Sequence, residues 1–198
     1  MKNHFSGLVL FVALSFVTLP FSTSASAAEA DHPRVMIETN LGNIVLELNK
    51  SKAPGSVDNF IRYVNEGYYD NTIFHRVISN FMIQGGGFTK SLQKKDTHSQ
   101  IQNEAHNGLK NVRGSIAMAR TSAPHSATAQ FFINVVNNDF LNHSAPTPRG
   151  WGYAVFGKVV EGMDVVDKIR KQATGPSGPF RSDVPKQAVI MQTVKVMQ

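Results

Sequence analysis

Hydrophobic and polar residues alternate in several short stretches of this chain, which is the period of a β-strand. Residues 35–39 and 44–48 form the first pair of such stretches, and the intervening Asn-Leu-Gly-Asn favours a tight turn. We therefore expect an N-terminal β-hairpin. Further strands are predicted at residues 72–78, 81–84, 114–120, 130–135, 153–159 and 188–197.

Two other segments have the periodicity of an amphipathic helix. The first begins near Pro54, which suits a first helical turn, and ends at Gly67, which suits a helix C-terminus. The second covers residues 162–171, with acidic residues near its start and basic residues near its end. Residues 90–111, 137–150 and 175–185 are predicted to be surface loops. Many short strands, two helices and no βαβ rhythm predict a mainly β fold, an antiparallel barrel.

The first residues are typical of a secretory signal peptide. Lys2 precedes an apolar run at residues 8–19, and Pro20 and a stretch of small residues follow the run. The run is shorter than the roughly 20 apolar residues that a membrane span needs. Because Ala25-Ser26-Ala27 fits a cleavage site, we predict a leader at residues 1–27 and one domain at residues 28–198. A retained N-terminal anchor is the alternative.

The composition excludes several kinds of site. The chain has a formal charge of +6 and no cysteine, so disulfides, thiolate metal sites and a lipid-modified cysteine are excluded. The seven histidines show no H-x-x-x-H or H-x-H pairing, so we expect no dedicated metal site. The densest basic cluster is only Lys90, Lys94 and Lys95, without a nucleic-acid motif. We therefore expect a generally basic surface and no nucleic-acid partner.

Three sequence blocks carry the most specific signal. The first, Phe-His-Arg-Val-Ile at residues 74–78 and Phe-Met-Ile-Gln-Gly-Gly-Gly at 81–87, places Arg76 and Gln84 eight residues apart among apolar side chains. The others are Gln-Phe-Phe-Ile-Asn at 130–134 and Tyr-Ala-Val-Phe-Gly-Lys-Val at 153–159. In this order and spacing they resemble the cyclophilin family of peptidyl-prolyl cis–trans isomerases, from about Val35 to the C-terminus. The resemblance implies a closed eight-stranded β-barrel capped by two helices, and no cofactor.

The implied reaction is rotation about an Xaa–Pro peptide bond. Resonance gives this bond a rotation barrier of about 18–20 kcal/mol, and unaided exchange takes tens to hundreds of seconds. Rotation breaks the conjugation and frees a lone pair on the proline nitrogen. A hydrogen-bond donor aimed at that lone pair stabilises the twisted state more than either planar state, which is what catalysis requires. No nucleophile, metal or general base is needed.

The resemblance also implies roles for individual residues. Arg76 matches the catalytic arginine, and Gln84 is implied to hold Arg76 and to bond the substrate carbonyl. The residues implied to form the pocket for the proline ring are Phe81, Met82, Phe132 and Leu141. Ala119 and Arg120 are implied to bond the substrate backbone, and Gln130 to form a polar wall. Phe140 and Tyr153 are the remaining substrate-binding positions. Taken singly, the apolar residues suit a barrel core better than a site, and Arg76 suits a surface charge. Together, with Arg76 and Gln84 at the family's spacing, they favour a site. His75 alternates away from Arg76, so we expect a structural, hydrogen-bonded histidine.

Two positions depart from the commonest cyclophilin pattern. Phe140 stands where many members carry tryptophan, and Tyr153 where many carry histidine. Both departures resemble the bacterial exported branch. In members with tryptophan, the resemblance implies that the indole N–H bonds cyclosporin, so Phe140 predicts weak cyclosporin binding.

These observations predict an exported peptidyl-prolyl isomerase that assists protein folding in a bacterial periplasm, with release outside the cell as the lesser possibility. We expect a monomer that acts on proline-containing unfolded or folding polypeptides and has no membrane association once the leader is removed. Two alternatives remain open. One is a cyclophilin-like proline-peptide binding or chaperone module with incidental turnover, and the other is a basic exported protein that binds anionic polymers.

Overall fold

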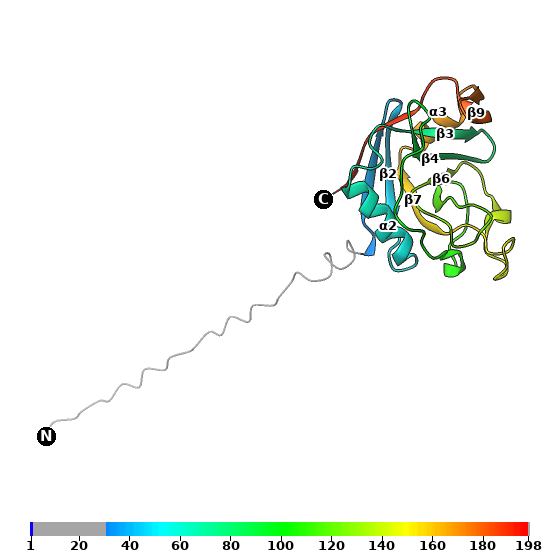
Figure 1. Ribbon diagram of the computed structural model, residues 1–198. Helices are drawn as coiled ribbons and strands as arrows, with labels where there is room; N and C mark the ends of the chain where they lie inside the picture. Colours follow the sequence, from blue (N-terminus) through cyan, green and yellow to red (C-terminus); the bar gives the residue numbers. More distant parts are fainter. Residues whose placement is uncertain (2–30, 198) are drawn as a thin grey trace.

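The structure is a computed structural model, and it describes Met1 and residues 31–197 (Figure 1). The predicted leader therefore lies, but for Met1, outside the described residues. Eight strands are β1 (Arg34–Thr39), β2 (Gly42–Leu48), β3 (Thr72–Ile78), β4 (Met82–Thr89), β5 (Ser115–Met118), β6 (Phe131–Asn134), β7 (Val155–Glu161) and β10 (Ile190–Val196). They close into one antiparallel barrel in the order β1-β10-β3-β4-β6-β5-β7-β2. The predicted barrel and its N-terminal hairpin are confirmed.

Both predicted helices are present, as α2 (Pro54–Asn65) and α3 (Met163–Arg170). In Figure 1 α2 lies at the lower end of the barrel and α3 at the upper end. Pro54 occupies the first turn of α2, where its missing N–H costs nothing. Gly67 ends the helix with φ +63°, and its N–H bonds the Val64 carbonyl at 3.0 Å while the Tyr68 N–H bonds the Tyr63 carbonyl. Within residues 31–197, no helix is long and apolar enough to cross a membrane.

The loop predicted at residues 175–185 is wrong. Strands β8 (Thr174–Ser177) and β9 (Phe180–Pro185) form a separate two-stranded antiparallel sheet there. Glycine, proline and serine are frequent in this segment, so it shows no alternation of hydrophobic and polar residues. The turn between the strands uses Gly178 at φ +53°, a conformation that glycine adopts without strain. The other two loops contain short 3₁₀ turns, η1 (Ala105–Asn107) and η2 (Asp139–Leu141), and isolated β-bridges at Lys94 and Ile101.

Strand β4 is longer than predicted, because it continues through the three glycines to Thr89. Gly86 has φ +78°, and a Cβ atom there would lie 2.8 Å from the Tyr69 ring. Register shifts in the facing strand β3 accompany this stretch. The glycines therefore let aromatic side chains pack directly on the strand.

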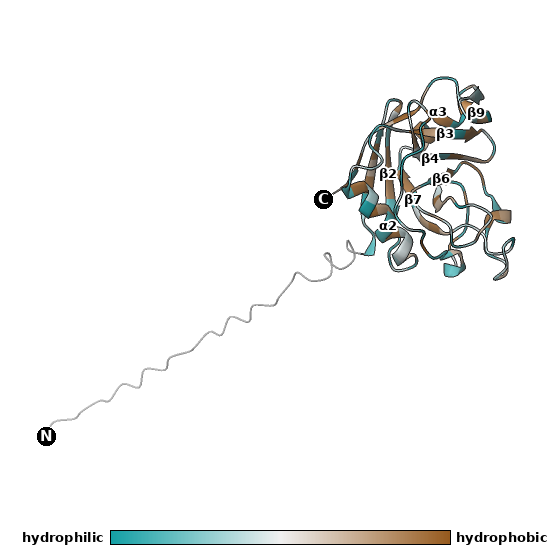
Figure 2. Cartoon of the chain, viewed as in Figure 1, coloured by the Kyte–Doolittle hydropathy of each residue, from teal (hydrophilic) through white to brown (hydrophobic). Residues whose placement is uncertain are grey.

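Alternation along the strands creates two hydrophobic clusters. The larger one fills the barrel and includes Phe131 and Ile133 of β6 together with the inner faces of α2 and α3. The smaller one includes Phe132, the residue between them, and therefore lies on the opposite face of the sheet. Figure 2 shows hydrophobic and hydrophilic residues side by side along the barrel strands. The second cluster, outside the barrel, marks the position of the candidate site.

His75 is a buried structural residue, as predicted, but its Nδ1 atom has no hydrogen-bond partner among the described residues. Its ring packs between Phe88 and Phe180, at centroid distances of 4.6 and 5.4 Å. Burial, together with the charge of Arg76, lowers the pKa of His75 from 6.5 to about 4. The ring is therefore neutral at physiological pH and is held by packing.

We expect the free energy of unfolding to fall as the pH drops from about 6.5 towards 4, because the unfolded histidine takes up a proton that the folded one refuses. Between about pH 7 and pH 5 the loss should be about 2 kcal/mol. The pKa values of the Glu47 and Asp167 carboxyl groups are lowered, so their contribution to the free energy of unfolding is lost at a lower pH than that of His75. In His75→Leu, urea unfolding at both pH values should show a flatter dependence. The exposed His106→Leu is the control, and an unchanged slope in His75→Leu would contradict this account.

Candidate active site

A row of side chains crosses four neighbouring strands on the outer face of the barrel. Arg76 of β3 lies opposite Gln84 of β4, and Gln84 lies opposite Phe132 of β6. Phe132 in turn lies opposite Ala117 of β5. Directly paired residues on one face of a sheet have neighbouring side chains. The antiparallel register therefore brings together residues that are up to 56 positions apart in the sequence, as the numbers 76 and 132 show.

Arg76, Gln84 and Phe132 of this row line a cavity of about 340 Å³. The lining residues are Arg76, Phe81, Met82, Gln84, Ala119, Arg120, Phe132, Phe140, Leu141 and Tyr153. The structure therefore brings together every site residue predicted from the sequence except Gln130. That residue lines an adjoining hollow of about 280 Å³, which shares Gln84, Ala119 and Arg120 with the first.

The cavity has a buried aromatic floor and an exposed rim. Phe132 is only 4% exposed, and the Tyr153 ring meets it edge-on at a centroid distance of 5.6 Å. Phe140 is 75% exposed and stacks on Phe81 with an interplanar angle of 24°. Such a pocket suits a small apolar ring bound to a chain that remains in solvent.

Three buried asparagines, which the sequence analysis missed, fix the loops around the pocket. The Asn138 side chain donates to the Phe81 carbonyl at 2.9 Å and to Asn134 Oδ1 at 2.7 Å. The Asn111 side chain donates to the carbonyls of Leu141 and Tyr153, at 3.2 and 3.3 Å. Asn111 and Asn138 lie outside the quoted motifs, and most of their partners are backbone carbonyls distant in the chain, so the sequence gives no signal for them.

Gln84 does not hold Arg76 as the sequence analysis expected. Its amide donates to Gln130 Oε1 at 2.9 Å instead. Gln130 can lie this close to β4 because Gly87 has no side chain; a Cβ atom there would be 2.5 Å from Gln130. The charged partner of Arg76 is Asp183 of β9, with Nε and Oδ2 3.6 Å apart. A carboxylate competes better for a guanidinium than a neutral amide does.

Arg120 forms one edge of the groove. Its Nε donates to the Gly152 carbonyl at 2.8 Å, and its guanidinium lies 4.5 Å from the centroid of the Tyr153 ring. These contacts hold the Arg120 side chain in place, so its guanidinium has a structural role. The neighbouring Ala119 N–H bonds the Gln130 carbonyl at 2.9 Å and anchors the chain just beyond β5.

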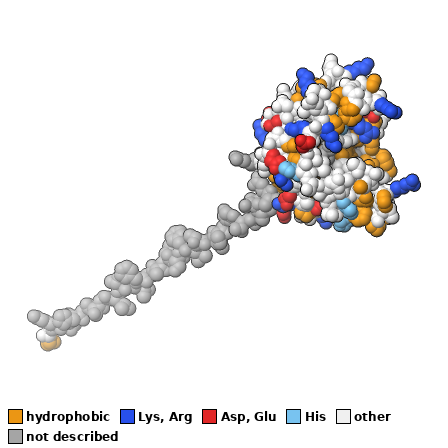
Figure 3. All heavy atoms as spheres, in the orientation of Figure 1, with side chains coloured by type: hydrophobic (Ala, Val, Ile, Leu, Met, Phe, Trp, Pro, Cys, Tyr) orange, Lys and Arg blue, Asp and Glu red, His pale blue; other side chains and the backbone are white. Residues whose placement is uncertain are grey.

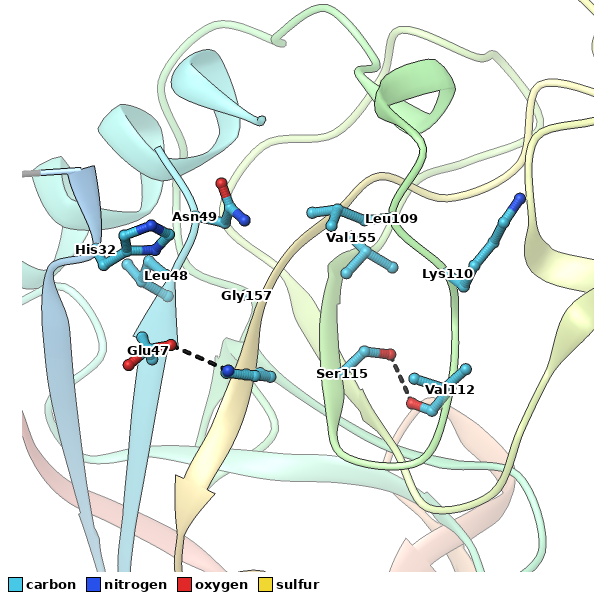
Figure 4. Close-up of a pocket in the computed structure, with 11 residues that line it drawn as sticks. His32, Glu47, Leu48, Asn49, Leu109, Lys110, Val112, Ser115, Val155 and Gly157 are labelled. Atoms are coloured by element: carbon cyan, nitrogen blue, oxygen red, sulfur yellow. Dashed lines mark hydrogen bonds and ion pairs between the residues drawn. The ribbon is translucent and has the colours of Figure 1, made fainter. Parts of the chain in front are cut away.

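A third hollow, of about 300 Å³, lies elsewhere on the barrel and contains none of the predicted site residues (Figure 4). Its walls include Leu48, Leu109 and Val155, and a Glu47–Lys158 ion pair of 3.1 Å crosses its edge. The guanidinium and aromatic floor that would serve a proline ring are absent from its lining. The cavity at Arg76 is therefore the better candidate.

The site has the chemistry of a groove that binds its ligand without a metal ion. Residues 31–197 contain no group of three His, Cys, Asp or Glu side chains that could hold a metal ion. On the face seen in Figure 3, Lys and Arg side chains are spread among other types and form no single continuous patch. The arrangement places the guanidinium of Arg76, with that of Arg120 at the edge, beside a pocket for an apolar ring.

Comparisons with known proteins agree with this geometry. The family model described as "Cyclophilin type peptidyl-prolyl cis-trans isomerase/CLD" matches residues 34–196. The chain belongs to the cyclophilin family. This cyclophilin is 60% identical to peptidyl-prolyl cis-trans isomerase B of Escherichia coli (strain K12), over 83% of this chain and 99% of the relative. It is 51% identical to peptidyl-prolyl cis-trans isomerase A of Dickeya dadantii, over 90% of each chain.

Solved structures show the same fold. A crystal structure of a cyclophilin type peptidyl-prolyl cis-trans isomerase from Cryptosporidium parvum matches with a TM-score of 0.67 and 28% identity, over 84% of this chain and 98% of that one. A second structure of the same protein, in the presence of the dipeptide Ala-Pro, matches equally well over 83% and 99%. The cyclophilin described here is a peptidyl-prolyl cis–trans isomerase.

Proposed function

We propose that this cyclophilin assists the folding of exported proteins in a bacterial periplasm, with Arg76 as the donor that stabilises the twisted Xaa–Pro bond. The observation that carries the proposal is the position of Arg76 and Phe132 on one row of the barrel, facing the same 340 Å³ cavity. The barrel backbone fixes their separation, so the donor needs little reorganisation during the reaction.

The substrate proline would insert its ring between Phe132, Met82 and Leu141, which line the cavity. Arg76 lies at the mouth of the pocket with 42% of its side chain exposed. From there its guanidinium can reach the nitrogen of the bound proline. An arginine remains charged at every physiological pH, so the donor is always available.

The chain on either side of the proline would lie along the shared edge of the two hollows. Gln84, Ala119 and Arg120 line both, so a bound polypeptide can run from the proline pocket into the second hollow. An open groove of this kind accepts an extended segment of an unfolded protein, which supports a folding role. The Gln84 amide donates one N–H to Gln130, which leaves its second N–H and its carbonyl oxygen for a bound polypeptide.

Export is supported by the order of basic, apolar and small residues at positions 2–28. If this leader is cleaved, protein purified from exporting cells should begin at Ala28 or Glu29. Mass spectrometry of the intact periplasmic protein measures this directly. As a matched control, replacing both Ala27 and Ala28 with bulky residues should block cleavage, because the position before each of the two cleavage points requires a small side chain. Soluble exported protein that still carries Lys2 would contradict the assignment.

A further inference from the structure

The ion pair between Arg76 and Asp183 joins the active site to a part of the fold outside the barrel. Asp183 belongs to β9, in the two-stranded sheet with β8, and the β9 strand lies beside β3 in Figure 1. The carboxylate Oδ2 is 3.6 Å from Arg76 Nε. Asp183 does not line the cavity at Arg76, so it can affect the reaction only through its contact with that arginine.

The β8–β9 sheet is held firmly against β3. Phe180 of β9 packs on His75, the residue before Arg76, and meets Phe88 edge-on at 5.0 Å. Next to Asp183, Val184 is only 6% exposed. The backbone that carries the carboxylate is therefore anchored on both sides, although the carboxylate itself is partly exposed.

The backbone of Asp183 adopts φ +69°, in the left-handed region. Residues with a side chain seldom adopt this conformation, and aspartate and asparagine tolerate it best. Here the conformation turns the side chain of Asp183 towards β3, where its carboxylate meets Arg76. An uncommon backbone conformation beside a functional group is a reason to look for a functional contact.

The pair also has a suitable orientation for catalysis. Asp183 contacts the guanidinium through Nε, which leaves the two terminal nitrogens for a substrate. In the part of the chain that the structure describes, no hydrogen bond joins Gln84 to Arg76, and the Gln84 amide N–H donates to Gln130. Among the described residues, Asp183 is the one carboxylate that forms an ion pair with Arg76.

We propose that Asp183 is a positioning residue for the isomerase: its carboxylate holds Nε of Arg76 and aims the terminal nitrogens at the bound proline. This inference rests on the proposed role of Arg76. An exposed ion pair contributes little to stability, so the contribution of Asp183 should be seen in turnover. A small loss of alignment at a reacting centre lowers the rate of the chemical step.

The test is Asp183→Asn, because asparagine keeps the shape and tolerates the left-handed backbone while removing the charge. We expect kcat for an Ala-Pro peptide to fall by roughly twofold to tenfold, with KM and the unfolding temperature little changed. Ser182→Ala, exposed on the same strand, is the control and should keep full turnover. In ¹⁵N spectra the Nε–Hε signal of Arg76, assigned by its absence in Arg76→Ala, should shift in Asp183→Asn and not in Ser182→Ala.

Combining the two substitutions separates this inference from the proposed function. If Asp183 acts through Arg76, Asp183→Asn should cause no further loss in an Arg76→Ala background. An unchanged kcat in Asp183→Asn beside a large loss in Arg76→Ala would overturn the positioning role alone. An equal loss from Asp183→Asn in both backgrounds would overturn it as well. Full turnover in folded Arg76→Ala would instead overturn the proposed role of Arg76.

Discussion

Arg76→Ala should lower the turnover of an Xaa–Pro peptide by about tenfold to a few hundredfold and leave the protein folded. A hydrogen bond from a charged donor is worth about 1.5–3 kcal/mol, and each 1.4 kcal/mol corresponds to about a factor of ten in rate. Because the bond to the proline nitrogen strengthens only as the peptide bond twists, the loss should appear mainly in kcat. The pocket of Phe132, Met82 and Leu141 is untouched, so KM should change much less.

The measurement is a protease-coupled or NMR exchange assay of kcat and KM, with circular dichroism to confirm the fold. Arg62→Ala is a matched control: it removes an arginine of similar exposure, 58% against 42%, that pairs with Glu66 on helix α2. That variant should retain full turnover. Near-normal turnover in folded Arg76→Ala would refute the assigned donor.

Phe140→Trp should increase cyclosporin affinity by roughly tenfold to a hundredfold. Phe140 is 75% exposed at the rim and stacks on Phe81, so an indole fits there without disturbing the floor of the pocket. The indole adds an N–H donor that phenylalanine lacks. Leaving a buried acceptor unpaired costs about 1–3 kcal/mol, which corresponds to the expected gain in affinity.

Turnover of a short proline peptide should hardly change in Phe140→Trp, because the peptide depends on Arg76 and Phe132. Fluorescence or calorimetric titration with cyclosporin measures the affinity, and the same samples supply the turnover. Phe140→Leu, which also lacks a donor, should show no gain. Tight binding by the unmodified protein, or no gain in Phe140→Trp, would show that this position does not control the drug.

The barrel could be predicted from the sequence because its strands alternate. Residues such as Phe131 and Phe132 must face opposite sides of a sheet, and both faces are apolar here because a second cluster covers the outer one. The candidate site could be predicted because its residues lie in motifs of fixed spacing. Ten of the eleven predicted positions line one cavity, and Gln130 lines its neighbour.

The parts that were missed depend on tertiary contacts. Strands β8 and β9 have turn-forming residues and no alternation, and they are stabilised by packing of Phe180 on His75 and Phe88. Asp183 therefore appeared to be a loop residue. The Gln84–Gln130 bond and the Arg76–Asp183 ion pair were also missed, because each joins residues that are distant in the sequence.

The central claim is that an Xaa–Pro bond rotates in the cavity beside Arg76. Two-dimensional exchange NMR of an Ala-Pro peptide with a small amount of the purified, isotope-labelled protein tests this most directly, since one sample reports both exchange and binding. We predict fast cis–trans exchange, with peptide-induced shifts at Phe132, Ala119 and Gln84 and an acceleration that is about tenfold to a few hundredfold smaller in Arg76→Ala. Exchange at the uncatalysed rate, or shifts confined to the hollow around Glu47 and Leu109, would contradict the account.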